Sequence, residues 1–126
     1  MPLINDFFYV QSSSHTSGTI AAHLQLNAMH RIFEGHFPGQ PVVPGVCMLQ
    51  IIKEMLEAAL GQALQMRKAD HIKFLAVIDP RKSVDVDAAI RYTCSEDSYE
   101  VTASLFKEET VYLKLRGNFS VSGKLS

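Results

Sequence analysis

Residues 36–60 read HFPGQPVVPGVCMLQIIKEMLEAAL, and the two parts of this stretch have opposite local character. The part up to Gly45 contains three prolines and two glycines, so it can sustain neither a helix nor a strand ladder. Residues 46–60 contain neither, and Gly61 follows as a residue that commonly ends a helix. We therefore expect a shaped loop and then a helix, which other parts of the chain surround because it is apolar on most sides. Its apolar positions at helical spacing are Val46, Leu49, Ile52, Met55, Leu56 and Leu60.

Segments with strand character lie on both sides of this helix. Upstream, residues 7–10 and 18–26 predict a β-hairpin whose turn is the stretch SSSHTSG. Downstream, four segments separated by DPRK, SEDS and KEE predict antiparallel strands, at residues 71–78, 83–94, 99–106 and 110–121. This order favours an α+β fold in which a sheet curls around one long helix, as a single domain over residues 1–126.

The composition excludes several classes of protein. The 126 residues carry 12 basic and 13 acidic side chains, a balance without the electrostatic footprint of a nucleic-acid-binding protein. No apolar run approaches the roughly 20 residues that span a membrane. Because the N-terminal stretch MPLINDFFYV also lacks the pattern of a signal peptide, we expect a cytoplasmic protein.

The cysteines and histidines do not form a recognisable metal-binding or disulfide pattern. Cys47 and Cys94 lie far apart without a CxxC pair, which argues against both a disulfide framework and a zinc site. The five histidines are scattered, with no HxxxH or HExxH spacing. We expect neither a metal nor another cofactor.

The loop before the helix carries a specific motif. The stretch HFPGQPVVPG resembles the active-site signature HFPG-x-P-x-x-PG of the β-hydroxyacyl-acyl carrier protein dehydratases, which have the hotdog fold. The matching residues are His36, Phe37, Pro38, Gly39, Pro41, Pro44 and Gly45. A weaker likeness continues through KFLAVIDP at residues 73–80, so the resemblance covers most of the chain. It implies a curved antiparallel sheet wrapped around one long central helix.

The motif predicts how the site works. The prolines and Gly39 hold His36 in a set direction, and an imidazole so placed is a good general base near neutral pH. At Pro44 and Gly45 the helix begins, where free backbone N–H groups favour a developing negative charge. In the dehydratases this region polarises the thioester carbonyl, and we extend that role to Gly45 and its neighbours. The alternative is a loop histidine that only binds its neighbours. The predicted substrate-binding residues are Phe37, Gly39, Pro44, Gly45, Val46 and Gln50.

The helix departs from the dehydratase pattern at two positions. Where the dehydratases have a catalytic carboxylate, supplied across a dimer, this chain has Gln50, which cannot donate a proton as a carboxylic acid does. One turn later, where glutamine is common, it has Glu54. Since positions i and i+4 share a helix face, we predict Glu54 as the catalytic acid, acting directly or through a water. The alternative is a solvent-facing charge.

Three functions follow from the resemblance. The first is dehydration of a 3-hydroxyacyl thioester on acyl carrier protein to the trans-2-enoyl thioester, in fatty acid or related lipid biosynthesis. The second is a partner-dependent or non-catalytic subunit that binds the acyl chain while a paralogue supplies the carboxylate. The third is thioester hydrolysis or acyl-chain binding, since fold alone does not choose the reaction.

The resemblance also implies partners. We expect a homodimer, with stacking of dimers into hexamers and a heterodimer with a paralogue left open. An acidic acyl carrier protein is expected to meet basic side chains, although most of these are equally consistent with an ordinary solvated surface. The candidates are Arg67, Lys68, Lys73, Arg81, Lys82 and Arg91. Chain length, pathway and the choice between acyl carrier protein and coenzyme A stay open.

Overall fold

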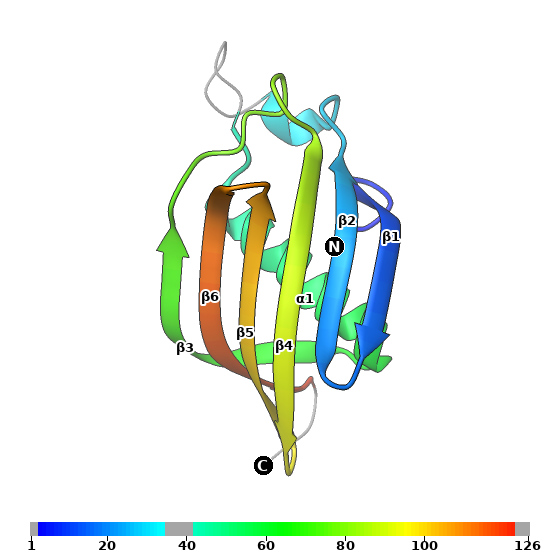
Figure 1. The fold of residues 1–126 in the computed structure, drawn as a ribbon, viewed down its shortest axis with the longest axis vertical. Coiled ribbons are helices and arrows are strands. Elements are labelled where there is room, and N and C mark those ends of the chain that lie inside the picture. The colour runs from blue at the N-terminus through cyan, green and yellow to red at the C-terminus, as the bar shows by residue number, and fades with distance from the viewer. Residues whose placement is uncertain (1–2, 35–41, 123–126) are drawn as a thin grey trace.

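The computed structural model describes residues 3–34 and 42–122. The helix α1 spans Gly45–Leu60, and a short 3-10 helix, η1, spans Arg31–Phe33. The strands are β1 (Phe8–Thr16), β2 (Thr19–Leu26), β3 (Leu64–Phe74), β4 (Asp85–Ser95), β5 (Ser98–Lys107) and β6 (Thr110–Val121). Two strands thus precede the long helix and four follow it, as the sequence predicts (Figure 1).

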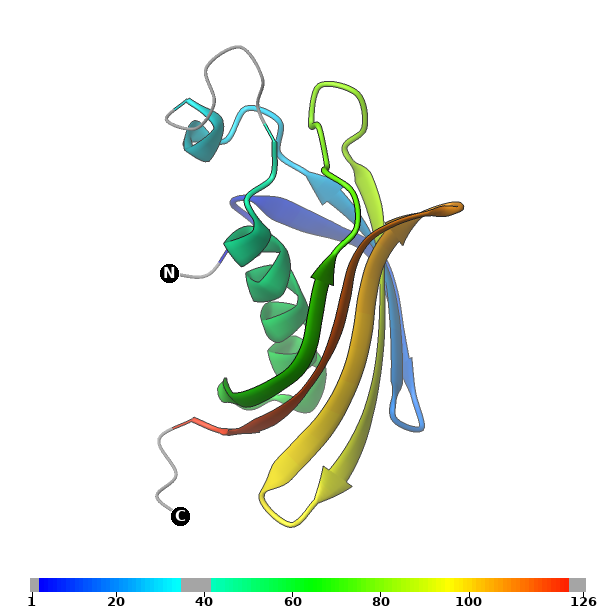
Figure 2. The same cartoon turned by 90° about the vertical axis from the view of Figure 1, so that its left-hand side faces the viewer.

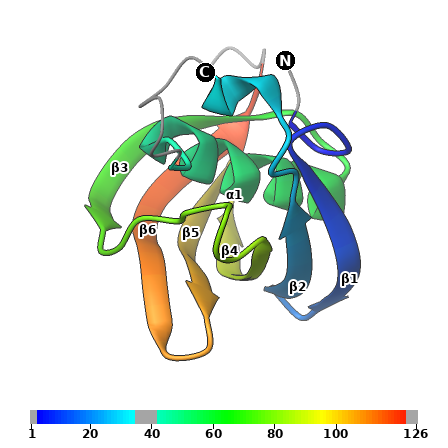
Figure 3. The ribbon, with the colours of Figure 1, turned by 90° about the horizontal axis from the view of Figure 1, so that it is seen from above.

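The six strands form one antiparallel sheet in the order β1-β2-β4-β5-β6-β3. The sheet curves around α1, which lies against its concave side (Figure 2). Seen from above, the strands form an arc with the helix inside it (Figure 3). This arrangement is the hotdog fold, so the predicted α+β class is confirmed.

The core lies between α1 and the concave side of the sheet. Along β2 and β4, alternate residues point inward and are buried, as the period-two pattern predicts. They meet Ile51, Ile52 and Leu56 of the helix, whose side chains are fully buried. Each such side chain contributes about 1.5–3 kcal/mol to stability. Helix and sheet therefore hold each other through apolar contact.

The ends of α1 follow from local chemistry. Pro44 precedes it in an extended conformation, with φ −61° and ψ 146°. Gly61 ends it with a left-handed φ of 67°, and the N–H of Gly61 bonds to the carbonyl oxygen of Glu57 at 2.8 Å. The predicted stop is confirmed. Val46, one of the apolar residues at helical spacing, is 71% exposed in the single chain. Where most of a helix is apolar, spacing alone does not identify the face that packs on the sheet.

Two predicted strand boundaries are wrong. β1 continues through the serine-rich stretch to Thr16, and the turn consists of Ser17 and Gly18 alone. Backbone pairing with β2 does not need apolar side chains, so an exposed strand at the edge of a sheet can be polar. β3 spans Leu64–Phe74 instead of residues 71–78. Its pairing with β6 is interrupted twice by bulges, which destroy the alternation by which a strand is recognised.

No helix in the described part of the chain is long and apolar enough to cross a membrane. Both cysteines are free thiols: Cys47 is buried in α1, and Cys94 is exposed near the end of β4.

Candidate active site

The start of α1 presents backbone donors. Pro44 accepts the first helical hydrogen bonds, from the N–H groups of Cys47 at 3.0 Å and Met48 at 3.3 Å. No side chain among residues 3–34 and 42–122 caps this end of the helix. The positive end of the helix dipole therefore meets its surroundings at Gly45, as the predicted carbonyl-polarising role requires.

A cleft of about 560 Å³ opens beside this helix end. One wall comes from the residues around Pro44 and Gly45, and the other from the segment that follows β3, which passes the start of α1 in Figure 2. The lining residues are Val42, Val43, Pro44, Gly45, Met48, Phe74, Leu75, Ala76 and Val77. Because none of these side chains is polar, the cleft is suited to an acyl chain rather than to a charged metabolite.

A side chain at Gly45 would crowd the ring of Phe74, which would have to move aside. A Cβ added there would lie 2.9 Å from Cζ of Phe74, closer than real Cβ contacts come. Phe74 is half exposed, so its ring forms an outer wall over the start of the helix. The glycine thus lets a second group come close to the helix backbone at the site where a carbonyl oxygen would be bound.

Three predicted site residues, His36, Phe37 and Gly39, lie outside the described residues. Their roles stay predictions. The described chain stops at Glu34, directly after η1, and resumes at Val42, which lines the cleft.

Gln50 and Glu54 are in direct contact. The Nε2 group of Gln50 donates to Oε2 of Glu54 at 2.8 Å, so the expectation that the two share a helix face is confirmed. Glu54 is only 5% exposed, which rules out the alternative of a solvent-facing charge. Its carboxylate also accepts hydrogen bonds from the backbone N–H groups of Leu3 and Ile4. Sequence reasoning missed these partners, because they lie about 50 residues away along the chain. The acid role of Glu54 stays a prediction.

Gln50 and Val46 share the face of α1 that the sheet leaves uncovered. Val46 is 71% exposed and lies one turn before Gln50. The helix start and the amide of Gln50 are therefore accessible to a substrate or to a second chain.

The six basic residues considered as a carrier-binding cluster do not form one patch. Lys73 and Arg91 line a groove of about 440 Å³ on the outer side of the sheet. Lys68 pairs with Asp70 at 3.7 Å, and Arg81 binds Asp79 in the turn before β4. Hydrogen bonds from Arg81 hold the pKa of Asp79 below its ordinary value.

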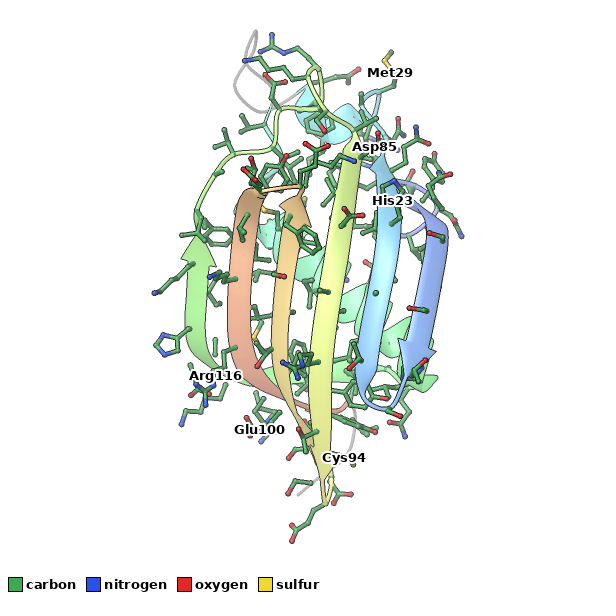
Figure 4. The ribbon with its side chains drawn as sticks, in the orientation of Figure 1. His23, Met29, Asp85, Cys94, Glu100 and Arg116 are labelled. Carbon is green, nitrogen blue, oxygen red and sulfur yellow. The ribbon has the colours of Figure 1, made fainter. Side chains whose placement is uncertain are left out.

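The groove on the outer side of the sheet is also lined by His, Lys and Arg residues that were not among the predicted carrier-binding candidates. Figure 4 labels Arg116 there, on β6. His71 and Lys114 also line the groove. Lys114 and Arg116 alternate with the buried Leu113 and Leu115, so the alternation of β6 was the signal that could have placed them outward.

No group of three or more His, Cys, Asp or Glu side chains arranged to hold a metal ion occurs among residues 3–34 and 42–122.

The chain matches the model of the ApeI dehydratase family (ApeI-like) over residues 11–113. Among curated proteins, the chain is similar to the 3-hydroxyacyl-(acyl-carrier-protein) dehydratase FabZ of Roseobacter denitrificans, with 29% identity over 80 residues. That match covers 60% of this chain and 51% of the relative. The corresponding enzyme of Mannheimia succiniciproducens is 23% identical over 107 residues, which cover 85% of this chain and 67% of that protein. The chain thus spans about half to two thirds of these relatives.

Solved structures share the fold. The dehydratase heterocomplex ApeI:P from Xenorhabdus doucetiae matches with a TM-score of 0.69 and 17% identity, covering 87% of this chain and 96% of that one. A putative thioesterase, a phenylacetic acid degradation-related protein from Ralstonia eutropha, matches with a TM-score of 0.63 and 12% identity, covering 90% and 84%. At these identities the matches establish the hotdog fold and leave the reaction open.

Proposed function

The chain belongs to the ApeI-like dehydratase family, and from this premise we propose that it removes water from a 3-hydroxyacyl thioester to form the trans-2-enoyl thioester. The observation that carries the proposal is the start of α1 at Gly45, which no described side chain caps and which lies beside an apolar cleft, at the end of the HFPGQPVVPG stretch. Such an end offers N–H donors to a thioester oxygen, and the cleft offers room for the acyl chain.

In the proposed reaction His36 is the general base. It takes a proton from the carbon next to the thioester carbonyl, while the N–H groups at Gly45 and Val46 stabilise the negative charge that develops on the carbonyl oxygen. The electrons of the C–H bond form the new double bond. The C3–O bond breaks, and the leaving oxygen receives a proton from the His36 imidazolium, in place of the Glu54 acid that the sequence predicted, and departs as water. The histidine therefore ends in its starting state.

The substrate is proposed to be attached to an acyl carrier protein, as in the names of the curated relatives. The reaction would take place in the cytoplasm. We further propose that the site is completed by a second chain, since Gln50 and Val46 face away from their own sheet. In a homodimer the helix face of one chain would then meet the cleft of the other.

The test is the conversion of purified protein and 3-hydroxyacyl thioesters, from C4 to C14 on a carrier protein, followed by mass spectrometry. The expected product is 18 Da lighter than the substrate, with no free acid released. Substitution His36→Ala should lower the rate at least about 100-fold, the usual contribution of a general base. Full activity in His36→Ala would refute the proposed base, and release of free acid would instead indicate a thioesterase.

A second candidate is a subunit that needs a different partner for activity. Two observations favour it: Gln50 occupies the position of the expected carboxylate, and a structural neighbour is described as a dehydratase heterocomplex. In that case the purified chain alone is inactive, and Gln50→Glu generates activity in it. A wild-type homodimer that is active by itself, with Gln50→Glu no faster, excludes this candidate.

A further inference from the structure

Glu54 occupies an unusual position for a charged side chain. Within the described part of the chain it is the only buried polar or charged residue. Both of its oxygens face backbone donors: the N–H of Leu3 lies 2.8 Å from Oε1 and 2.7 Å from Oε2, and the N–H of Ile4 lies 2.8 Å from Oε1. A buried carboxylate with several donors is a costly arrangement to break, because removing it leaves those donors unsatisfied.

The fourth contact of this carboxylate determines how Gln50 is oriented. An amide has a donor end and an acceptor end, whereas a carboxylate only accepts. Since Gln50 lies 2.8 Å from Oε2 of Glu54, the amide must present its NH₂ group to that oxygen. The carbonyl oxygen of Gln50 is then directed away from Glu54.

No donor to the carbonyl oxygen of Gln50 is found among residues 3–34 and 42–122. Gln50 does not line the cleft of its own chain, so the substrate would reach it from the cleft of the second chain proposed above. The Gln50 amide makes no other hydrogen bond among the described residues. The side chain is half-buried and starts from the uncovered face of α1, one turn after Val46. A hydroxyl group next to this oxygen would donate to it, whereas a second carbonyl would be repelled.

We infer that Glu54 is a positioning residue, which holds Gln50 so that its carbonyl oxygen accepts a hydrogen bond from the 3-hydroxyl group of the substrate. This inference rests on the proposed function and adds to it the group that recognises the hydroxyl. It differs from the acid role predicted for Glu54, because both Glu54 oxygens face N–H donors and neither is placed to give a proton. No proton passes through the pair: His36 takes the α-proton and returns it to the leaving oxygen.

The N-terminal segment belongs to the same arrangement. Leu3 and Ile4 reach Glu54 only because the chain turns back at Asp6 and Phe7, whose N–H groups both bond to the carbonyl oxygen of Leu3. The position of Gln50 therefore depends on Leu3 and Ile4, and the residue spacing in α1 does not identify these two as part of the site.

The test is a double-mutant cycle on kcat/KM with Gln50→Ala and Glu54→Gln. Each single change should lower kcat/KM roughly tenfold, the size of one hydrogen bond to substrate, and Glu54→Gln should add less than about twofold to Gln50→Ala. Equal effects of Glu54→Gln in both backgrounds would overturn the inference. So would loss of all activity together with loss of one limb of the pH profile, since those are the signs of a direct acid.

The chain offers a matched control in Glu57, one turn further along α1. Its Oε2 accepts the backbone N–H of Leu64 at 2.7 Å, so Glu57→Gln also removes a carboxylate that binds backbone. It should lower the stability of the protein but leave kcat/KM within about twofold, because Glu57 makes no contact with Gln50. A comparable loss of kcat/KM in Glu57→Gln would mean that Glu54 acts through stability alone.

A measurement on the wild-type protein separates this inference from the proposed function. In NMR spectra, the side-chain NH₂ of Gln50 should exchange with water more slowly than that of Gln62, because Glu54 holds it. Slow exchange in a protein without dehydratase activity would contradict the proposed reaction but would still support the hydrogen bond between Gln50 and Glu54. Equally fast exchange at Gln50 and Gln62 would overturn the positioning role of Glu54. Because the wild-type protein is measured, this outcome depends neither on its enzymatic activity nor on whether the Glu54→Gln variant folds.

Discussion

At the scale of single residues, the two cysteines have opposite environments. Burial raises the pKa of the Cys47 thiol above its ordinary value of 9.0, whereas Cys94 is exposed at the far end of β4. A thiol reacts as its thiolate, so burial suppresses reaction at Cys47 both through access and through charge. In the sequence both residues are unpaired cysteines without a motif, and only the structure shows that they differ in burial.

This contrast predicts a pH dependence. Because the folded state holds the Cys47 proton more tightly than the unfolded state, the contribution to stability is fully present below pH 9.0 and is lost as pH rises through the folded pKa. The free energy of unfolding should therefore fall above pH 9 in wild type, and more steeply than in Cys47→Ala. Urea unfolding from pH 7 to 10 measures this, with Cys94→Ala as the control. Identical slopes in wild type and Cys47→Ala would contradict the prediction.

At the scale of elements, β3 is held by a close approach to β6. A Cβ added at Gly117 would lie 2.6 Å from the backbone carbonyl oxygen of Lys68, next to the first bulge of β3. Backbone cannot swing aside as a side chain does, so only glycine fits. Because β3 leads directly into the wall of the cleft, this contact also positions Phe74 beside Gly45.

We predict that Gly117→Ala lowers the free energy of unfolding by about 1–3 kcal/mol, the usual cost of overpacking. Urea unfolding would measure it. Thr102→Ala, at an exposed position on the neighbouring β5, is the control and should stay within about 0.5 kcal/mol of wild type. If the two variants were equally stable, β3 would be free to shift, and the cleft wall would not depend on this contact.

At the scale of the whole molecule, large apolar side chains remain exposed around the candidate site. Val46 is 71% exposed, Phe74 51%, Leu75 52% and Val77 69%, and all four lie at or next to the cleft. A cluster of this kind, at the start of the helix and the end of an edge strand, is typical of a surface that another chain covers. It agrees with the proposed two-chain site.

We therefore predict a dimer of twice the 14.0 kDa chain mass, measured by sedimentation equilibrium. Val77→Asp should weaken association at least about tenfold, because a buried charge without a partner opposes the interface. Met29→Asp is the control, since Met29 is 89% exposed and does not line the cleft. A wild-type protein that is monomeric at tens of micromolar, or a Val77→Asp protein that dimerises normally, would contradict the prediction.

Much of this molecule can be predicted from local pattern. The helix with its end at Gly61 and the alternation in β2 and β4 depend on neighbouring residues, so they can be predicted without a structure. The HFPG motif pointed to the family in the same way, and the family match agrees with it. The boundaries of β1 and β3 were predicted wrongly. Both strands lie at the edges of the sheet, where a polar or bulged strand lacks a clear alternation of apolar and polar residues.

The fold class and the shared helix face of Gln50 and Glu54 were predictable from the amino-acid sequence, because both depend on spacing along the chain. Only the tertiary structure decided that Val46 is exposed, that Glu54 is buried, and that its carboxylate binds Leu3 and Ile4. Burial and hydrogen-bond partners depend on contacts between distant segments, and those exist only once the sheet has curved around the helix.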